Sequence, residues 1–316
     1  MATIIVTFTC YIINMATRID IPHVSRDERI GSVFNEMFKV IYATDNSDST
    51  EVEWDFSHCA FFHPFFIAPL AIYKQHCGKS ITATNRHGHL DKYLNLIKFD
   101  NTLDIHTVDN AQNVLNGYLG KSYIPICRFV SSSGSDVDCI QSVLQEIIER
   151  QSKMSGELRT PLSYMLGEIV GNIEEHAYSK YGYIYSQYLP SEKAINICIA
   201  DAGITIHGSY VRRNRFLDKI GDNEAFALRF ANDGYSTKDL PGAESRGFGI
   251  STSKRMLVDG LGGQFFMLSG GAFHRYDTNG SVFVNLPPDI CWNGTITLMR
   301  IPVSAPAGFD YHKYVK

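Results

Sequence analysis

Apolar residues recur with the period of a helix between residues 162 and 177, and they predict the buried side of one helix. The apolar positions are Leu162, Leu166, Ile169, Val170, Ile173 and Ala177. The polar side of the same helix carries Glu168, Asn172 and His176 at i, i+4 and i+8, so these three side chains form one stripe. A solvated face needs only residues such as Lys and Glu, so this stripe indicates a binding site.

A second helix with the same apolar spacing is predicted just before this one, after the linker-like segment "SSSGSD" at residues 131–136. Asp138 stands near its start, and its apolar stripe is Ile140, Val143, Leu144, Ile147 and Ile148. We therefore expect a linker over 131–137 and a new domain from residue 138.

The first 130 residues alternate between strand and helix patterns. Residues 51–56 alternate apolar and charged side chains, as a half-buried strand does, and 63–78 reads as a helix that Gly78 ends. A strand at 79–84 and an amphipathic helix at 90–99 follow, which predicts a small open sheet with helices packed on it. The apolar start, 1–20, is interpreted as a core strand, with Met15 as an alternative natural start.

The remainder of the chain alternates strand patterns with polar loops. Residues 181–201 predict two strands around a Pro-containing turn, and 203–248 is a polar stretch rich in Gly, Asn, Arg and Asp. Three more strand-like runs follow at 263–270, 280–286 and 294–302. The predicted fold class is α/β (α+β), with a small module over 1–130 and a second domain over 138–316.

Composition narrows the functional class only slightly. A length of 316 residues favours two domains, and 44% hydrophobic with 20% charged residues is typical of a soluble protein. A net charge of −4 gives no reason to expect nucleic-acid binding. The seven cysteines contain no CxxC pair, and no stretch is long and apolar enough to cross a membrane, so we expect reduced thiols and a cytoplasmic location without membrane contact.

The residues around the helical stripe suit a nucleotide and its metal. Asp201 follows the strand 195–200, and a fixed carboxylate there can accept a hydrogen bond from the amine of adenine. Gly203 would let the base approach the backbone. Asn172 offers the hard oxygen ligand that Mg²⁺ accepts beside phosphates and waters, and Glu168, one turn earlier, could orient or deprotonate a nucleophile.

Glycines are also placed for phosphate binding. Gly247 and Gly249 lie at a predicted loop-to-helix junction, where backbone N–H groups and the helix field favour anions. Lys238 and Arg246 flank these glycines and are further phosphate candidates. Each motif alone is weak, but their joint occurrence in order is specific.

Together these motifs resemble the GHKL ATP-binding fold of DNA gyrase, mismatch-repair ATPases, histidine kinases and anti-sigma serine kinases. "GEIVGNIEEHA" (167–177) is similar to the N box, which puts Glu168 in the general-base position, Asn172 in the magnesium-ligand position and His176 where the anti-sigma branch often has histidine. "DAGIT" (201–205) resembles the G1 box, with Asp201 reading adenine. The resemblance covers roughly residues 140–303 and implies a two-layer α/β sandwich with a mixed sheet for the second domain.

The rest of the resemblance includes a lid and two departures. "GYSTK…SRGFGIS" is similar to the lid and G2 box, and Thr295 matches a threonine that assists the adenine-reading carboxylate through water. Thr205 and Ser251 stand where the family usually has smaller residues, and Thr205 is expected to stiffen the lid hinge. The resemblance implies ATP and Mg²⁺ as cofactors, and lid closure that alters a protein-binding surface.

Two groups of residues keep alternative interpretations. His176 either orients a group on the phosphate side or closes the helix end, where a cation is favourable. The run of Arg212, Arg213 and Arg215 is interpreted as a solvated basic stretch rather than a phosphate or partner contact. The histidines and cysteines of the first module have no spacing that matches a zinc site.

The first module resembles a STAS-type domain more weakly. Residues 51–99 follow its order of strand, loop, helix, strand and helix, but the loop has no Ser or Thr after Ser57 where the phosphorylatable serine would stand. This resemblance implies a module for docking a protein partner or for self-association.

The sequence thus predicts an ATP-binding regulatory protein with GHKL-type ATPase or anti-sigma-like kinase activity. The main alternative is a nucleotide-sensing module without turnover. A histidine autokinase and a structural adaptor with a decayed site are weaker alternatives.

Overall fold

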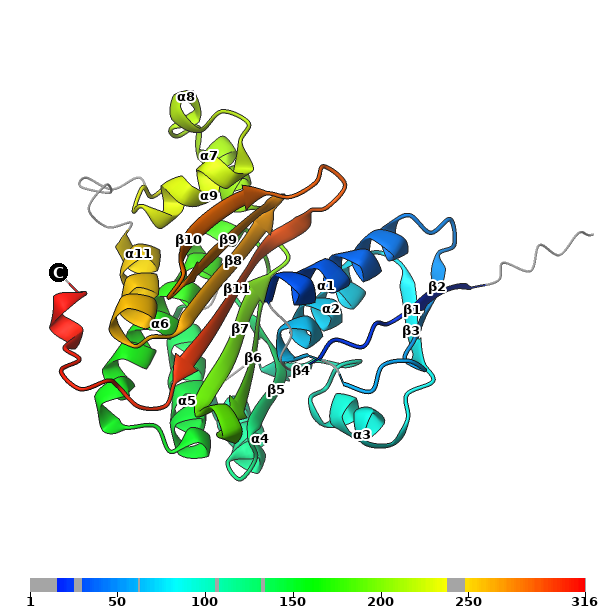
Figure 1. Cartoon of the computed structure of the whole chain (residues 1–316), viewed down its shortest axis with the longest axis horizontal. Coiled ribbons are helices and arrows are strands. Elements are labelled where there is room, and N and C mark those ends of the chain that lie inside the picture. Colours follow the sequence, from blue (N-terminus) through cyan, green and yellow to red (C-terminus); the bar gives the residue numbers. More distant parts are fainter. Residues whose placement is uncertain are drawn as a thin grey trace, which may run out of the picture.

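The computed structural model describes residues 16–25, 30–61, 63–105, 108–131, 134–237 and 248–315. The fold is mixed α/β, with 44% helix, 26% strand and a mixed sheet, which confirms the predicted class. Its described strands form two sheets, one of three strands and one of eight (Figure 1).

The small sheet is parallel and has the order β1-β2-β3. Its strands are β1 (Thr17–Asp20), β2 (Glu51–Asp55) and β3 (Ser80–Thr84). The large sheet has the order β10-β9-β8-β11-β7-β6-β5-β4, and only its β4–β5 pair is parallel. In chain order its strands are β4 (Leu103–Ile105), β5 (Tyr123–Val130), β6 (Tyr181–Leu189), β7 (Ala194–Asp201), β8 (Gln264–Gly270), β9 (Ala272–Asp277), β10 (Gly280–Asn285) and β11 (Trp292–Pro302).

The helices lie on both faces of the large sheet. The first half of the chain contains α1 (Ile30–Asp45), α2 (Pro64–His76), α3 (Gly88–Leu96), α4 (Val108–Leu115) and the 3₁₀ turn η1 (Asn116–Tyr118). The middle contains α5 (Gly134–Ser152), η2 (Gly156–Leu158), α6 (Arg159–Asn172), the π-helical turn η3 (Ile173–Ala177) and η4 (Pro190–Glu192). The remainder contains α7 (Ile206–Arg213), α8 (Leu217–Ile220), α9 (Glu224–Asn232), α11 (Phe248–Arg255), the π-helical turn η5 (Met256–Gly260) and η6 (Tyr311–Lys313).

Side chains along β7 point alternately to the two faces of the large sheet, so this strand contributes to two hydrophobic cores. All eight residues of β7 are buried, because helices cover both of its faces. Cys198 and Ala200 belong to the core shared with α1 and α2, whereas Ile197 and Ile199 belong to the core shared with α5 and α6. Figure 1 shows the same arrangement, with α1 and α2 on one side of the sheet and α5, α6 and α11 on the other.

Polar pairs add to the apolar contact between the small-sheet unit and the large sheet. Nε2 of His76, at the end of α2, lies 2.6 Å from the Tyr183 hydroxyl on β6. The hydroxyls of Tyr93 (α3) and Tyr185 (β6) lie 2.9 Å apart, and Tyr93 also donates to Gln187. Tyr183 and Tyr185 are buried, and their hydroxyls find partners on α2 and α3, as buried polar groups usually do.

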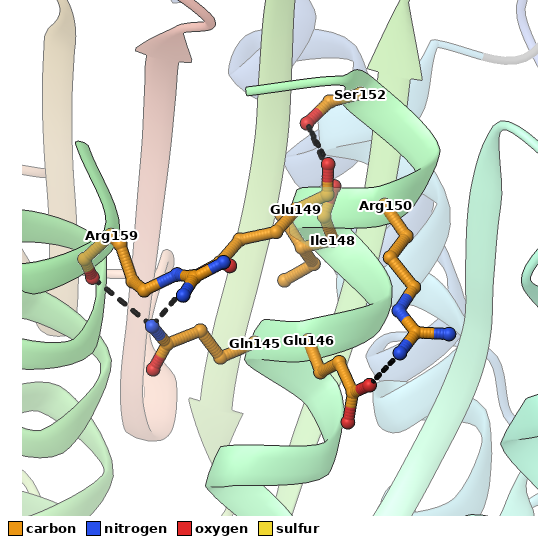
Figure 2. A network of polar contacts seen from close by, with 7 residues as sticks. All are labelled: Gln145, Glu146, Ile148, Glu149, Arg150, Ser152 and Arg159. Atoms are coloured by element: carbon orange, nitrogen blue, oxygen red, sulfur yellow. Dashed lines mark hydrogen bonds and ion pairs between the residues drawn. The ribbon is translucent and has the colours of Figure 1, made fainter. Parts of the chain in front are cut away.

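The start of α6, the helix with the predicted stripe, is held by the preceding helix α5 (Figure 2). Arg159 Nε lies 2.9 Å from Glu149 Oε2, and Gln145 donates to both the Arg159 carbonyl and Glu149. Because the Arg159 side chain is 72% exposed, this network orients the helix more than it stabilises it. Apolar packing supplies most of the stability, since the predicted stripe from Leu162 to Ala177 is buried.

The two sheets do not coincide with the predicted division at residue 130. Strand β4 lies before that residue and β5 ends at it, yet β5 pairs with β6 of the large sheet. The helix α5 begins at Gly134, inside the segment 131–137 that the sequence predicts as a linker. The polar stretch 203–248 also contains three helices that were not predicted from the sequence (α7, α8 and α9), whereas α11 starts at the predicted loop-to-helix junction.

Residues 1–15 lie outside the described part of the chain, so the predicted strand over 1–20 is described only as β1. Among the helices that the structure describes, none has the length and apolar character needed to span a bilayer.

Candidate functional site

One cavity lies between α6, the end of β7 and helices α7 and α9. It has about 880 Å³ of empty space, part of which is open to solvent. Six of the predicted site residues line it: Glu168, Asn172, His176, Asp201, Gly249 and Thr295. A concave, largely apolar site with a few converging polar groups is the usual form of a small-molecule site.

Asp201 is the buried charged group of this cavity. Its side chain stands at the end of β7, and only 2% of the residue is exposed. The Gly203 N–H donates to Oδ1 at 2.9 Å, and this bond fixes the carboxylate. Burial raises the pKa of Asp201 to about 7, although backbone hydrogen bonds from Gly203 and Thr295 act in the opposite direction.

Two glycines allow close packing around Asp201. A β-carbon at Gly203 would overlap the Ala177 carbonyl oxygen, which already accepts a hydrogen bond from Ile204 N at 2.8 Å. Gly294 has φ +105°, and a β-carbon there would lie 2.6 Å from Asp201 Oδ1. Both positions therefore require glycine, and Gly203 fixes the end of the π-helical turn η3 next to Asp201.

Glu168 and Asn172 line the cavity from α6, one helical turn apart. Gly249, at the start of α11, approaches Glu168 so closely that a β-carbon would overlap its carboxylate. Tyr164 lies one turn before Glu168. Burial raises the pKa of Tyr164, and the nearby Glu168 carboxylate raises it further. This end of the cavity thus combines a carboxylate, a carboxamide and a helix N-terminus.

His176 lies in the π-helical turn that extends α6. Its Nδ1 lies 3.0 Å from the Thr237 hydroxyl, which in turn lies 3.2 Å from the Ser209 hydroxyl on α7. Its Nε2 lies 3.6 Å from Glu175 Oε2. π-Helical turns are rare and often occur at functional sites. His176 is therefore part of a polar chain in the cavity wall.

A second polar cluster supports the cavity from the sheet. Ser269, at the end of β8, accepts a hydrogen bond from Ile206 N at 2.8 Å and donates to the Gly294 carbonyl at 3.1 Å. Its hydroxyl also lies 3.1 Å from Thr295 Oγ1. The pairing of Ile296 with Ala200 places Thr295 alongside Asp201. This cluster joins the start of α7 to the strands that carry Asp201 and Thr295.

Thr205, the residue that departs from the resembled G1 box, has a clear local role. Its side chain caps α7 by accepting a hydrogen bond from Gly208 N at 2.9 Å. Capping of this kind stabilises a helix by about 1 kcal/mol. Thr205 also lines the cavity.

The predicted basic residues do not all fall in the described part of the chain. Lys238, Arg246 and Gly247 lie outside it. Arg212 and Arg213, exposed at the end of α7, lie over the ring of Tyr178, with guanidinium carbons 3.9 Å and 5.6 Å from its centroid. Neither residue lines the cavity.

Several cavity residues were missed in the sequence analysis. Ser209, Tyr210, Tyr235 and Thr237 line the cavity from the polar stretch 203–248, and Tyr235 and Thr237 belong to the lid-like motif but were not predicted as site residues. Tyr210 donates a hydrogen bond to the Tyr235 carbonyl, and the Tyr235 ring stacks on Phe230 with centroids 3.8 Å apart. Aromatic residues in an otherwise polar loop were the available signal, because they indicate a local core.

The donor set around the cavity constrains the metal that it could hold. Glu168 and Asn172 are oxygen ligands, and no cysteine occurs among the described residues that line the cavity. Within the described chain, no three His, Cys, Asp or Glu side chains come together as a metal site. This set fits Mg²⁺, which takes one or two protein oxygens together with phosphate and water oxygens.

Comparison of the chain with protein-family models, with curated proteins and with solved structures gave no match.

Proposed function

We propose that the protein binds ATP with Mg²⁺ in this cavity and acts as a regulatory protein of the GHKL type, with ATPase or anti-sigma-like kinase activity. The observation that carries the proposal is the convergence of Asp201, Asn172 and Glu168 on one cavity from two separate elements. A fold that served only packing would have no reason to bring these three polar groups together.

Asp201 supports adenine as the base. A buried carboxylate oxygen held by the Gly203 N–H can accept a hydrogen bond from an exocyclic amine, and guanine has no amine at the equivalent position. Burying a carboxylate is costly, so its presence here favours a ligand that supplies a donor. Thr295, alongside Asp201, offers a hydroxyl for a bridging water.

The polar groups at the other end of the cavity support the proposal that a triphosphate binds there. Asn172 would hold Mg²⁺ through its amide oxygen, and the metal would neutralise phosphate charge. The Glu168 carboxylate, one turn earlier, would accept a proton from the attacking water or from a partner's hydroxyl. Gly249 N–H, at the first turn of α11, would face a phosphate oxygen.

The small-sheet unit is proposed to be STAS-like and to bind a protein partner or a second copy of the chain. Its order of β2, α2, β3 and α3 supports this proposal. The unit packs on the face of β6 that carries Tyr183 and Tyr185. Strand β6 follows η3, the turn that contains His176, along the sequence. Partner binding and nucleotide binding could be coupled through this strand.

The alternative is a protein that senses a nucleotide without turning it over. The Thr205 cap supports it, because a hinge residue that is fixed by a side-chain hydrogen bond resists lid movement. Purified protein that retains ATP for hours without forming ADP would favour this alternative.

Calorimetry with ATP and Mg²⁺ tests the proposal on the full chain. Asp201→Asn replaces an acceptor with a mixed donor–acceptor group, and we expect affinity to fall about ten- to a hundredfold. Asp277→Asn is the matched control, since Asp277 is also buried and accepts a backbone N–H but lies outside the cavity. No heat of ATP binding to the wild type, or equal losses in both variants, would refute the proposal.

A further inference from the structure

The hydrogen-bonded chain Ser209–Thr237–His176 spans three elements and lines the cavity. Ser209 belongs to α7, Thr237 follows α9, and His176 belongs to η3. Ser209 and Thr237 are more than nine-tenths buried. Their bond lengths of 3.2 Å and 3.0 Å join them to the imidazole.

The direction of this chain follows from the contacts of His176. Its Nε2 faces the Glu175 carboxylate at 3.6 Å, so we assign the ring proton to Nε2 and leave Nδ1 as an acceptor. Thr237 then donates to Nδ1 and accepts from Ser209. The hydroxyl protons of Ser209 and Thr237 therefore both form hydrogen bonds within this series of three residues. Ser209 therefore presents only lone pairs to the cavity.

The place of the chain indicates which part of a nucleotide it would meet. His176 precedes Ala177, which packs against Gly203 beside Asp201. Glu168 lies two helical turns from His176, roughly 12 Å along the axis. The sugar of a nucleotide joins base to phosphates, so it would lie between Asp201 and Asn172, next to this wall.

A cavity wall that offers only hydrogen-bond acceptors favours a ligand group that donates a hydrogen bond. Phosphate oxygens would meet lone pairs there and be repelled, whereas a sugar hydroxyl can donate to Ser209. We infer that Ser209 accepts a hydrogen bond from a ribose hydroxyl, with Thr237 and His176 as positioning residues, so that the site selects ribonucleotides over deoxyribonucleotides. This inference rests on the proposed function.

Calorimetry on the full chain with ATP, 2′-deoxy-ATP and 3′-deoxy-ATP, each with Mg²⁺, tests it. We expect the wild type to bind one deoxy nucleotide about tenfold more weakly than ATP, because a hydrogen bond contributes about that factor. Ser209→Ala should bind ATP as weakly as the wild type binds that deoxy nucleotide. In this variant the ratio of the ATP affinity to the deoxy-nucleotide affinity should therefore be close to one. Ser253→Ala, a buried serine on α11 outside the cavity, should keep the wild-type ratio.

The positioning role has its own readout. Thr237→Val removes the acceptor of the Ser209 proton, and His176→Phe removes the acceptor of the Thr237 proton. In both variants we expect the hydroxyl chain to reverse or break and the ribose preference to decrease about threefold or more. A purely structural role would weaken all three nucleotides equally. If Ser209→Ala does not fold, Thr237→Val tests the inference in its place.

The outcomes separate this inference from the proposed function. Equal affinity of the wild type for all three nucleotides would overturn the inference alone, as would an unchanged ratio in Ser209→Ala. If no nucleotide binds to the wild type, the inference and the proposed function both fail.

Discussion

Gly249 and Glu168 touch across the cavity, so closely that a methyl group added at position 249 would overlap the carboxylate. The contact joins the start of α11 to the middle of α6. Any side chain at position 249 would therefore have to displace the Glu168 carboxylate. The position of Glu168 therefore depends on α11.

Gly249→Ala should displace the Glu168 carboxylate and reduce ATP turnover at least tenfold, with a smaller effect on ATP affinity. Steady-state kinetics together with calorimetry would separate the two effects. Gly171→Ala is the control, because a β-carbon at Gly171 in α6 meets no atom within 4 Å. That control should be stabilised by about 0.5–1 kcal/mol. Normal turnover in Gly249→Ala would contradict the proposal that the position of the Glu168 carboxylate matters for turnover.

Glu168→Gln should keep the shape of the side chain but remove its basicity. We expect ATP hydrolysis, or phosphoryl transfer to a partner, to fall by a factor of about 10² to 10⁴, which is the usual contribution of a general base. ADP formation and ATP affinity should be measured on the same preparation. Unchanged turnover would exclude Glu168 as the base.

The contribution of Asp201 to the stability of the ligand-free protein should decrease as pH rises from about 4 to about 7, whereas the buried His63 and His274, whose pKa values burial lowers, act in the opposite direction. Burial raises the pKa of Asp201 from 3.8 to about 7, so in this range the native state holds a proton that the unfolded state has lost. Stability falls where the native state binds more protons, and the effect is complete above pH 7. The penalty is at most about 4 kcal/mol.

Asp201→Asn removes this titration. Chemical denaturation of both proteins at pH 4 and pH 8 should show the variant gaining stability relative to the wild type at the higher pH. Asp277→Asn gives the comparison for a buried carboxylate outside the cavity. A wild-type–variant difference that is the same at both pH values would argue against a raised pKa.

The chain should unfold in a single cooperative transition despite its two sheets. The core that contains α1 and α2 also contains residues of β6, β7, β8 and β11, so neither unit keeps its core without the other. Differential scanning calorimetry should give one peak with equal calorimetric and van't Hoff enthalpies. Two separate peaks would show that the units are independent.

The contact between the units can be weakened directly. Tyr183→Phe removes the hydroxyl that lies 2.6 Å from His76 Nε2 and that also bonds Arg128, and it should cost about 1 kcal/mol. Tyr188, on the same strand, is less buried and makes no such contact with α2, so Tyr188→Phe is its control. An equal loss of unfolding free energy in both variants would mean that the contact between His76 and Tyr183 adds no measurable stability.

Much of the site helix and its neighbouring strands could be predicted from the sequence. The stripe from Leu162 to Ala177 is buried as predicted, because its spacing matches one face of a helix. The strands on either side of Pro190 also form as predicted, and Asp201 ends the second one. These elements are long and strongly patterned, so local sequence was sufficient.

Other elements depend on information that is not local. Helices α7, α8 and α9 lie in a polar stretch and share a small buried cluster of Tyr210, Ile220 and Ala227. Strand β9 was missed because His274 is polar, although it is fully buried and stacked on Phe283. The apolar run of β5 predicts burial, but the choice of β6 as its neighbour is decided by tertiary packing.

The pairing of β5 with β6 has a practical consequence for anyone who wishes to express the half of the chain that contains the cavity by itself. A fragment that starts at residue 131 would lose β4 and β5, so β6 would become an open edge. It would also lose the cover over Phe266, Leu268 and Leu298. Such a fragment should aggregate, and its failure to bind a nucleotide would say nothing about the intact protein.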